Sequence, residues 1–297
     1  MHTGFGTIIT AAVTPFTADG SIDLDAFRSI LRHLASNGSD SIVVTGTTGE
    51  SPTLSDDEKV LLWKAAVDEL GGEIPIIAGT GTNDTAHSVH LTQRACEAGV
   101  DGILVVTPYY NKPPREGLIK HFTAVARASS VPVILYNIPG RVVINLEPDV
   151  VAELSLLDNV IAIKQAQPDL EQFREIRRLA PTLAIYAGDD DSFFPMLREG
   201  AVGVISVASH IIGTQMARVA DAFNSGEHAA AAELAAQLDD VYESLAITAN
   251  PIPIKAALNL MGLEAGHVRL PLVDATQLQR ERIRGMLLRH DLVTTPA

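Results

Sequence analysis

Cysteine is almost missing from the sequence, since Cys96 is the only one among 297 residues. A single thiol cannot close an internal disulfide, and this usage fits a reducing compartment. Nothing around Cys96 would stabilise a thiolate. We therefore interpret it as a small apolar residue on the buried face of a helix.

Long apolar runs are missing as well. No stretch approaches the roughly 20 apolar residues that a membrane-spanning helix needs. The first residues, Met1-His2-Thr3-Gly4, lack the charged start and apolar core of a signal peptide. We expect a cytoplasmic protein that has no membrane partner.

Basic residues are outnumbered by acidic ones. Lys and Arg total 22 against 36 Asp and Glu, for a formal net charge of -14. This sign is unfavourable for neutralising the phosphates of a nucleic acid or an anionic membrane, so we exclude nucleic acid as a partner. The nine histidines are scattered. His87 and His90 share one expected helix without neighbouring ligands, which indicates a solvated face, and we predict no metal and no cofactor.

Eight short apolar runs recur along the chain. They are rich in β-branched residues, too short for helices and without strict alternation, which is typical of parallel strands buried on both faces. The runs are Thr7 to Val13, Ser41 to Thr45, Ile74 to Ala78, Gly102 to Thr107, Val131 to Tyr136, Val160 to Lys164, Leu183 to Ala187 and Val202 to Val207.

Helical patterns alternate with these runs, among them 56–70, 85–98, 115–128 and 170–179. Strict alternation predicts a parallel sheet with helical crossovers, and eight units match the size of a barrel. We predict an α/β fold, a closed (β/α)8 TIM barrel over residues 1–225. A doubly wound open sheet is the alternative. Its dinucleotide-binding form would have a Gly-rich fingerprint after the first strand, where Val13-Thr14-Pro15-Phe16 stands instead.

The pattern changes beyond Ser225, where the expected strands stop. Helical patterns cover 227–246, 253–261 and 276–289, and no linker rich in Pro, Gly or Ser precedes them. We predict that residues 226–297 form additional C-terminal helices, an extension packed on the barrel and not an independent domain.

Polar residues that close the apolar runs are the candidates for chemistry, because barrel active sites lie at the carboxyl ends of the strands. They are Gly46 to Glu50, Pro108 to Tyr110, Tyr136 with Asn137 and Arg141, Lys164, and Gly188 to Asp190. Lys164 is the one lysine of six that ends a buried strand. An ammonium in an apolar barrel mouth loses hydration, which favours the neutral amine that attacks ketones and forms imines. A lysine that reaches solvent or pairs with a carboxylate is the alternative.

Three hydroxyls, those of Tyr136, Thr47 and Tyr110, stand at the ends of expected strands. Imine chemistry needs a chain of groups that pass protons, and hydroxyls can both donate and accept. Each tyrosine taken alone is as well explained by packing. The segment Gly46-Thr47-Thr48-Gly49 adds amide groups that suit a carboxylate, although a plain strand-to-helix turn explains it too.

A family resemblance joins these segments. The motifs that carry it are Gly46 to Ser51, Ala78 to Gly81, Pro108 to Pro113, Leu135 to Arg141, Ile163-Lys164, Gly188 to Asp190, Gly203 to Ser206 and Asn250 to Pro253. In this order they resemble the dihydrodipicolinate synthase and N-acetylneuraminate lyase family over nearly the whole chain. The stretches 136–141 and 250–255 resemble the synthase branch and not the lyase branch.

The resemblance implies a class I aldolase that condenses pyruvate with aspartate 4-semialdehyde on the route to lysine. Lys164 would form the imine, and Tyr136, Thr47 and Tyr110 would relay protons. Thr48 and the backbone near Ile205 would hold the pyruvate carboxylate, and Arg141 the carboxylate of the second substrate. The resemblance also implies a homotetramer, a dimer of dimers in which Tyr110 reaches the site of a neighbouring subunit.

Three departures from the family pattern are visible. Gln165-Ala166-Gln167-Pro168 follows Lys164 where Glu-Ala-Thr/Ser-Gly is common, and His210 replaces a common Asn. Positions that bind lysine in regulated members read Asp56, Lys59, Asn83, His87 and Tyr109, with Lys59 and His87 unfavourable for a cation. We predict weak or absent feedback by lysine.

Two other functions stay open on the sequence. One is a related pyruvate-dependent aldolase acting on a 2-keto-3-deoxy sugar acid or 4-hydroxy-2-oxoglutarate, which would share Lys164 and Tyr136. The other is a noncatalytic ligand-binding barrel. Retro-aldol assays separate the first from the synthase, and covalent trapping at Lys164 separates the second.

Overall fold

The structure is a computed structural model that describes residues 4–294. Eight strands form a closed barrel in sequence order, and every neighbouring pair is parallel. Strand β8 closes on β1 with Ile8 opposite Val204 and Thr10 opposite Ser206. The strands are β1 (Ile8–Ala11), β2 (Ser41–Val44), β3 (Ile76–Gly79), β4 (Gly102–Val106), β5 (Val133–Asn137), β6 (Val160–Gln165), β7 (Ala184–Ala187) and β8 (Gly203–Ser206). The predicted fold class is confirmed.

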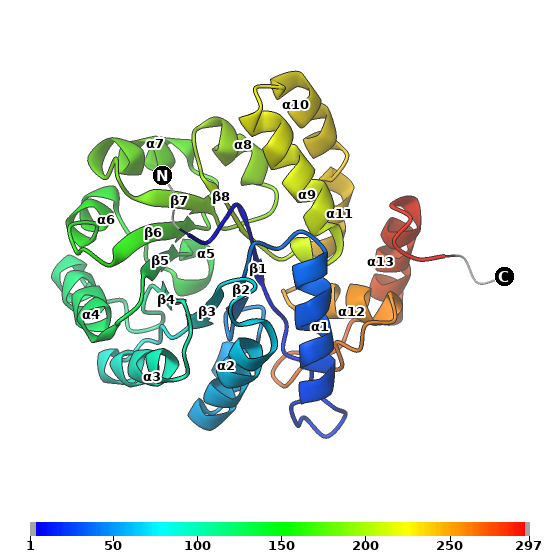
Figure 1. The fold of residues 1–297 in the computed structure, drawn as a ribbon, viewed down its shortest axis with the longest axis horizontal. Coiled ribbons are helices and arrows are strands. Elements are labelled where there is room, and N and C mark those ends of the chain that lie inside the picture. Colours follow the sequence, from blue (N-terminus) through cyan, green and yellow to red (C-terminus); the bar gives the residue numbers. More distant parts are fainter. Residues whose placement is uncertain (1–3, 295–297) are drawn as a thin grey trace.

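Helices surround the barrel, as Figure 1 shows. The predicted helices 56–70, 115–128 and 170–179 occur with those bounds, and the predicted 85–98 ends one residue earlier. The helices up to residue 224 are α1 (Leu24–Ser36), α2 (Asp56–Leu70), α3 (Thr85–Glu97), α4 (Arg115–Ala128), α5 (Pro139–Val142), α6 (Pro148–Leu154), α7 (Leu170–Leu179), α8 (Phe193–Arg198) and α9 (Ser209–Asn224), with the short 3-10 helix η1 (Ser51–Thr53).

Two apolar clusters follow from the alternation of side chains along the strands. Residues pointing inward, such as Ile9, Val43 and Ile134, fill the barrel with Phe5 below them. Residues pointing outward, such as Ile42 and Ile163, pack against the helices in a larger cluster. Both faces of each strand are buried, which explains why the runs are apolar without alternating.

The C-terminal region is helical, with α10 (His228–Ala236), α11 (Asp239–Leu245), α12 (Ile252–Leu260) and α13 (Gln277–Arg289). Helices α10 and α12 contact α9, and α13 contacts α11 and α12. The expected single helix over 227–246 is wrong, because the chain breaks into α10 and α11 at Gln237 and Leu238. There Leu238 N–H bonds to Ala235, a tighter turn that ends α10, and the acidic pair Asp239-Asp240 favours a new N-terminus. We propose the boundary at 225/226 as the point where this extension begins.

Chain segments beyond the barrel also return to its rim. The segment after α12 forms an antiparallel bridge between Phe16 and His267. Within residues 4–294, no helix combines the length and the apolar character required to cross a membrane.

Candidate active site

Lys164 and Tyr136 lie side by side at the carboxyl ends of β6 and β5. The two residues are register partners, and the Lys164 amine lies 4.5 Å from the centroid of the Tyr136 ring. Ala162 and Ala166, which flank Lys164 two positions away on either side, belong to the cluster inside the barrel. Alternation therefore directs Lys164 inward as well. Its side chain is 6% exposed.

The Lys164 amine has no fixed partner. No hydrogen bond or ion pair joins it to another residue between 4 and 294, and its contact is the face of Tyr136. Two carboxylates lie within electrostatic range, those of Asp189 and Asp190 after β7. Burial raises the pKa of both carboxyls, and the charge of Lys164 opposes this rise. An amine held this way is available to a substrate that enters the barrel mouth.

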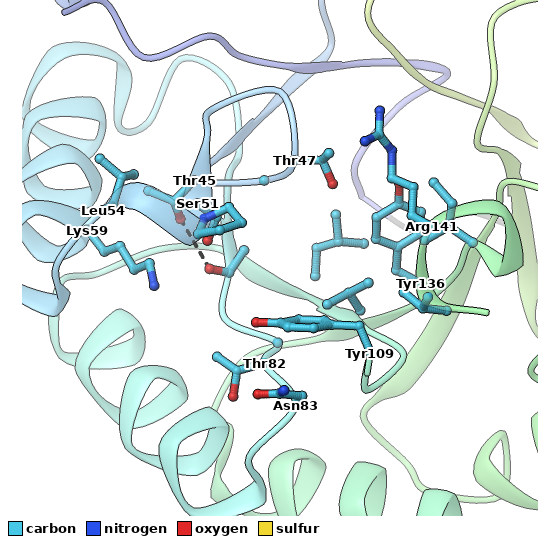
Figure 2. Close-up of a pocket in the computed structure, with 18 of the residues that line it drawn as sticks. Thr45, Thr47, Ser51, Leu54, Lys59, Thr82, Asn83, Tyr109, Tyr136 and Arg141 are labelled. Atoms are coloured by element: carbon cyan, nitrogen blue, oxygen red, sulfur yellow. Dashed lines mark hydrogen bonds between the residues drawn. The ribbon is translucent and has the colours of Figure 1, made fainter. Parts of the chain in front are cut away.

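A cavity of about 400 Å³ opens at the mouth, and Thr47 and Tyr136 both line it. Figure 2 shows Thr47, Tyr136 and Arg141 toward one end of the cavity, with Lys59, Thr82 and Asn83 at the other. The structure thus brings two of the three expected hydroxyls to one cavity. Lys164 is not among the lining residues, but its amine lies over the ring of Tyr136, which is.

Tyr110 is not brought to this cavity. Its side chain is 87% exposed, and its φ of +71° directs the chain away from the helical or extended path. The neighbouring Tyr109 lines the cavity instead. The three hydroxyls therefore do not meet within one chain, because the turn after β4 points Tyr110 outward. The expected place of Tyr110 in the site of a neighbouring subunit stays a prediction.

The two residues expected to hold a carboxylate are both buried. Thr48 is 2% exposed, and its hydroxyl accepts a hydrogen bond of 3.0 Å from the side-chain amide of Asn250. Ile205 is fully buried in β8 opposite Ile9, and its side chain belongs to the cluster inside the barrel. Asn250 was not a sequence candidate, because its partner lies 202 positions earlier.

Arg141 lies where two cavities meet. Its side chain is exposed on α5 and lines both the first cavity and a second of about 630 Å³. The second cavity is also lined by Asp189, Asp190 and Tyr242. Arg141 is the lining residue common to both cavities. Its guanidinium can bind one carboxylate through two parallel hydrogen bonds.

The far end of the first cavity refines one expectation. His87 is only partly solvated: its side chain is 38% exposed, it lines the cavity, and its ring bonds to Asp56 at 2.9 Å. His90 is exposed, as expected. Lys59 is 5% exposed, and Figure 2 shows its amine directed at the cavity. Burial lowers the pKa of Lys59, and Asp56 opposes this. Because α2 and α3 are neighbours, residues that look like solvent-facing positions in the sequence meet here.

Gln165 continues β6 into a buried network of amides. Its side-chain oxygen accepts from Asn137 at 3.1 Å, and Asn137 accepts from the backbone of Leu146 at 2.9 Å. Asn145 and Gln172 extend the chain of bonds. The four amides end at a carboxylate, because Asn145 also donates to Glu147 at 3.1 Å. The network ties the strand of Lys164 to the segment that follows Arg141.

His210 is fixed as a neutral ring between the segments that follow β1 and β8. Val13 N–H donates to Nε2 at 3.2 Å, and Nδ1 donates to the carbonyl of Val207 at 2.7 Å. Burial lowers the pKa of His210 from 6.5 to about 4. A proton on Nε2 would face the N–H of Val13 and break that bond.

A pH dependence of stability follows from this lowered pKa. In the unfolded chain His210 is protonated near pH 6.5, whereas in the folded chain it is protonated only near pH 4. The free energy of unfolding therefore falls as pH drops through this window, by roughly 3 kcal/mol at most. Burial also lowers the pKa of His121 from 6.5 to about 4. Denaturant unfolding of His210→Asn should show about half the loss of the parent between pH 6.5 and 4. An equally large loss in the variant would contradict the assignment.

Comparison with known proteins shows the family of this chain. The family model described as "Dihydrodipicolinate synthetase family" matches residues 4–289. The chain belongs to the dihydrodipicolinate synthetase family. It is 50% identical over 285 residues to the 4-hydroxy-tetrahydrodipicolinate synthase of Desulforamulus reducens, covering 95% of this chain and 96% of that one.

Solved structures agree with this placement in the dihydrodipicolinate synthetase family. A dihydrodipicolinate synthase from Bacillus anthracis is 43% identical with a TM-score of 0.93, covering 99% of both chains. The enzyme from Cyanidioschyzon merolae, described with lysine bound, is 42% identical with a TM-score of 0.96, covering 98% of this chain and 99% of that one.

Three of the six lysines of this family member are buried, namely Lys59, Lys164 and Lys255. Lys255 pairs with Glu50 at 2.7 Å. Sequence reasoning singled out Lys164 alone, because it ends a strand, and placed Lys255 with the ordinary helical lysines. An Ile-Pro-Ile-Lys-Ala-Ala-Leu stretch, with its lysine inside an apolar helix, was the available signal.

Proposed function

We propose that this chain condenses pyruvate with aspartate 4-semialdehyde to give 4-hydroxy-tetrahydrodipicolinate, in the biosynthesis of lysine. Full-length relatives that carry the synthase name support the reaction. The observation that carries the mechanism is the buried amine of Lys164 at the end of β6, unpaired and against the face of Tyr136. The chain is then a lyase of the Schiff-base type.

In the proposed reaction, the neutral amine of Lys164 attacks the ketone carbon of pyruvate, and loss of water gives an imine. The imine withdraws electrons from the methyl carbon, which loses a proton to become an enamine. That carbon then attacks the aldehyde carbon of the second substrate. The amino group of the second substrate closes the ring by displacing Lys164, which returns to its free form.

Proton transfers in these steps are assigned to Tyr136 and Thr47, which both line the cavity. The hydroxyl of Thr48 and the backbone near Ile205 are assigned to the carboxylate of pyruvate. Arg141 is assigned to the carboxylate of aspartate semialdehyde, because its planar guanidinium matches a carboxylate with two parallel hydrogen bonds. No metal or cofactor has a part in this scheme.

The reaction assay has two arms that decide between the proposed function and its rivals. Pyruvate with aspartate semialdehyde is expected to give product, with activity that survives a strong chelator. Cleavage of 2-keto-3-deoxy sugar acids and of 4-hydroxy-2-oxoglutarate is expected to be slower by about 10²-fold or more in kcat/KM. Faster cleavage than condensation would assign the chain to a related aldolase instead.

We propose a cytoplasmic homotetramer, a dimer of dimers, in which the exposed Tyr110 gives its hydroxyl to the relay of a neighbouring subunit. Tyr110→Phe is then expected to lower kcat by about 10²-fold without changing the fold, because one step of the proton relay is lost. Sedimentation at assay concentration checks the premise. A fully active monomer would contradict it.

Feedback by lysine is expected to be weak. The cavity end that carries Lys59 and His87 presents a buried ammonium to any cationic ligand, and like charges in a low-dielectric site repel. Activity is expected to stay above half at about 1 mM lysine, the upper end of the range typical for small-ligand sites. Lys59→Ala should bind lysine more tightly by calorimetry. Half-inhibition of the parent below about that concentration would show that the site accepts cations.

A further inference from the structure

The loop that carries Thr47 and Thr48 is bounded by two residues in the left-handed backbone region. Thr45 has φ +58° and Glu50 has φ +56°, and neither is glycine. Such conformations persist only where surrounding contacts fix them. Within the loop, Glu50 N–H donates to Thr47 and Ser51 N–H to Gly46, so the two ends are closed by their own backbone.

The side chain of Glu50 is held by the C-terminal extension. One carboxylate oxygen accepts from Lys255 at 2.7 Å, and the other accepts from the backbone N–H of Arg269 at 2.9 Å. The side chains of Glu50 and Lys255 are 1% and 3% exposed. Lys255 also donates to the carbonyl of His267 and lies 4.5 Å from the ring of Phe16. Every strong contact of this carboxylate therefore comes from residues more than 200 positions away.

Stability alone does not explain a buried ion pair here. Removing two charges from water costs several kcal/mol per ion, and an apolar pair of similar volume packs as well or better. The Glu50–Lys255 pair instead fixes the position of the Glu50 side chain, because both of its carboxylate oxygens accept hydrogen bonds. A second contact from the same region, Asn250 to Thr48, acts on the same loop.

We propose that Glu50 and Lys255 are positioning residues, which preset residues 46–50 so that the loop receives the carboxylate of the keto acid without rearrangement. This inference rests on the proposed pyruvate binding. It implies that the C-terminal extension, through Lys255 on α12, contributes to the affinity for pyruvate. Neither residue touches the reacting atoms, so the pair acts on binding and not on imine formation itself.

Glu50→Gln tests the proposal with little change of volume. The amide still accepts from Lys255, but its NH2 group faces the N–H of Arg269, so one of the two bonds is lost and Lys255 is left charged. We expect KM for pyruvate to rise by about tenfold or more, with kcat at saturating pyruvate within about threefold of the parent. Borohydride trapping at saturating pyruvate should remain complete.

Glu58→Gln is the matched control. Glu58 binds the guanidinium of Arg269 at 2.5 Å and 3.0 Å in the same network, but its side chain is 28% exposed and it does not hold the loop. In Glu58→Gln only the thermal midpoint should fall. KM for pyruvate should stay unchanged. If Glu50→Gln is folded and its KM also stays unchanged, the proposal is overturned, as it is if both variants raise KM equally.

Hydrogen exchange on the parent protein tests whether the loop is preset, even if Glu50→Gln does not fold. The amides of Glu50 and Ser51 are expected to be as well protected without pyruvate as with it, because the loop is already in place. Rapid exchange that slows only when pyruvate binds would overturn the proposal. The ligand-free measurement needs no pyruvate, so a failure of the proposed function would appear separately, as an absence of trapping at Lys164.

Discussion

Lys164→Ala is expected to lower kcat by about 10³-fold or more, the largest effect of any single substitution in this chain. The amine is the group that forms the imine, and no other lysine can replace it. Lys255 is bound to Glu50, and Lys59 lies at the far end of the cavity beside Asp56. Steady-state condensation of pyruvate with aspartate semialdehyde measures the loss.

Lys164→Ala also needs a control for packing, because Lys164 contacts the Tyr136 ring. Lys164→Met keeps most of the side-chain volume and removes the amine. Both variants should lose activity equally while their thermal midpoints stay close to that of the parent. Activity of Lys164→Met within tenfold of the parent would mean that the amine is not the nucleophile.

Arg141→Ala is expected to lower kcat/KM for the aldehyde by about 10- to 10²-fold, mostly through KM. The guanidinium lies where the two cavities meet, and a charge-assisted contact to a carboxylate contributes roughly 1.5–3 kcal/mol. Trapping of pyruvate alone should be unaffected, because Arg141 is assigned to the second substrate. Initial rates with each substrate varied in turn separate the two effects.

Arg141→Lys distinguishes charge from geometry at the same position. Lysine keeps the positive charge but loses the planar fork, so its kcat/KM for the aldehyde should lie between those of the parent and Arg141→Ala. If Arg141→Ala instead weakens pyruvate and leaves the aldehyde unchanged, the two carboxylates are assigned to the wrong residues.

Much of the barrel could be predicted from the sequence because its strands are buried on both faces. Each of the eight runs overlaps an observed strand, and β3, β5 and β6 extend one residue beyond their runs. The helices 56–70, 115–128 and 170–179 begin and end as expected. Ser55 shows why: its side chain caps α2 while Glu58 closes the capping box, a local signal that needs no tertiary contact. The break between α10 and α11 has no such cap, since no side chain caps the start of α11, and the acidic pair Asp239-Asp240 alone does not fix a boundary.

The site was predictable where strand ends carry it and not where distant segments meet. Lys164 and Tyr136 follow from the rule that parallel strands end at the same face of a barrel. The outward turn of Tyr110 depends on a left-handed backbone conformation that the local sequence does not predict. The meeting of His87 with Asp56, and of Glu50 with Lys255, depends on how helices pack, across 31 and 205 positions of chain.

The proposed mechanism requires that a keto acid reaches the amine of Lys164 and bonds to it. Mass spectrometry after borohydride reduction in the presence of pyruvate measures this directly. We expect one reduced pyruvate per chain, located by peptide mapping on Lys164 and missing in Lys164→Met. An unmodified chain, or the same adduct on a different lysine, would contradict it.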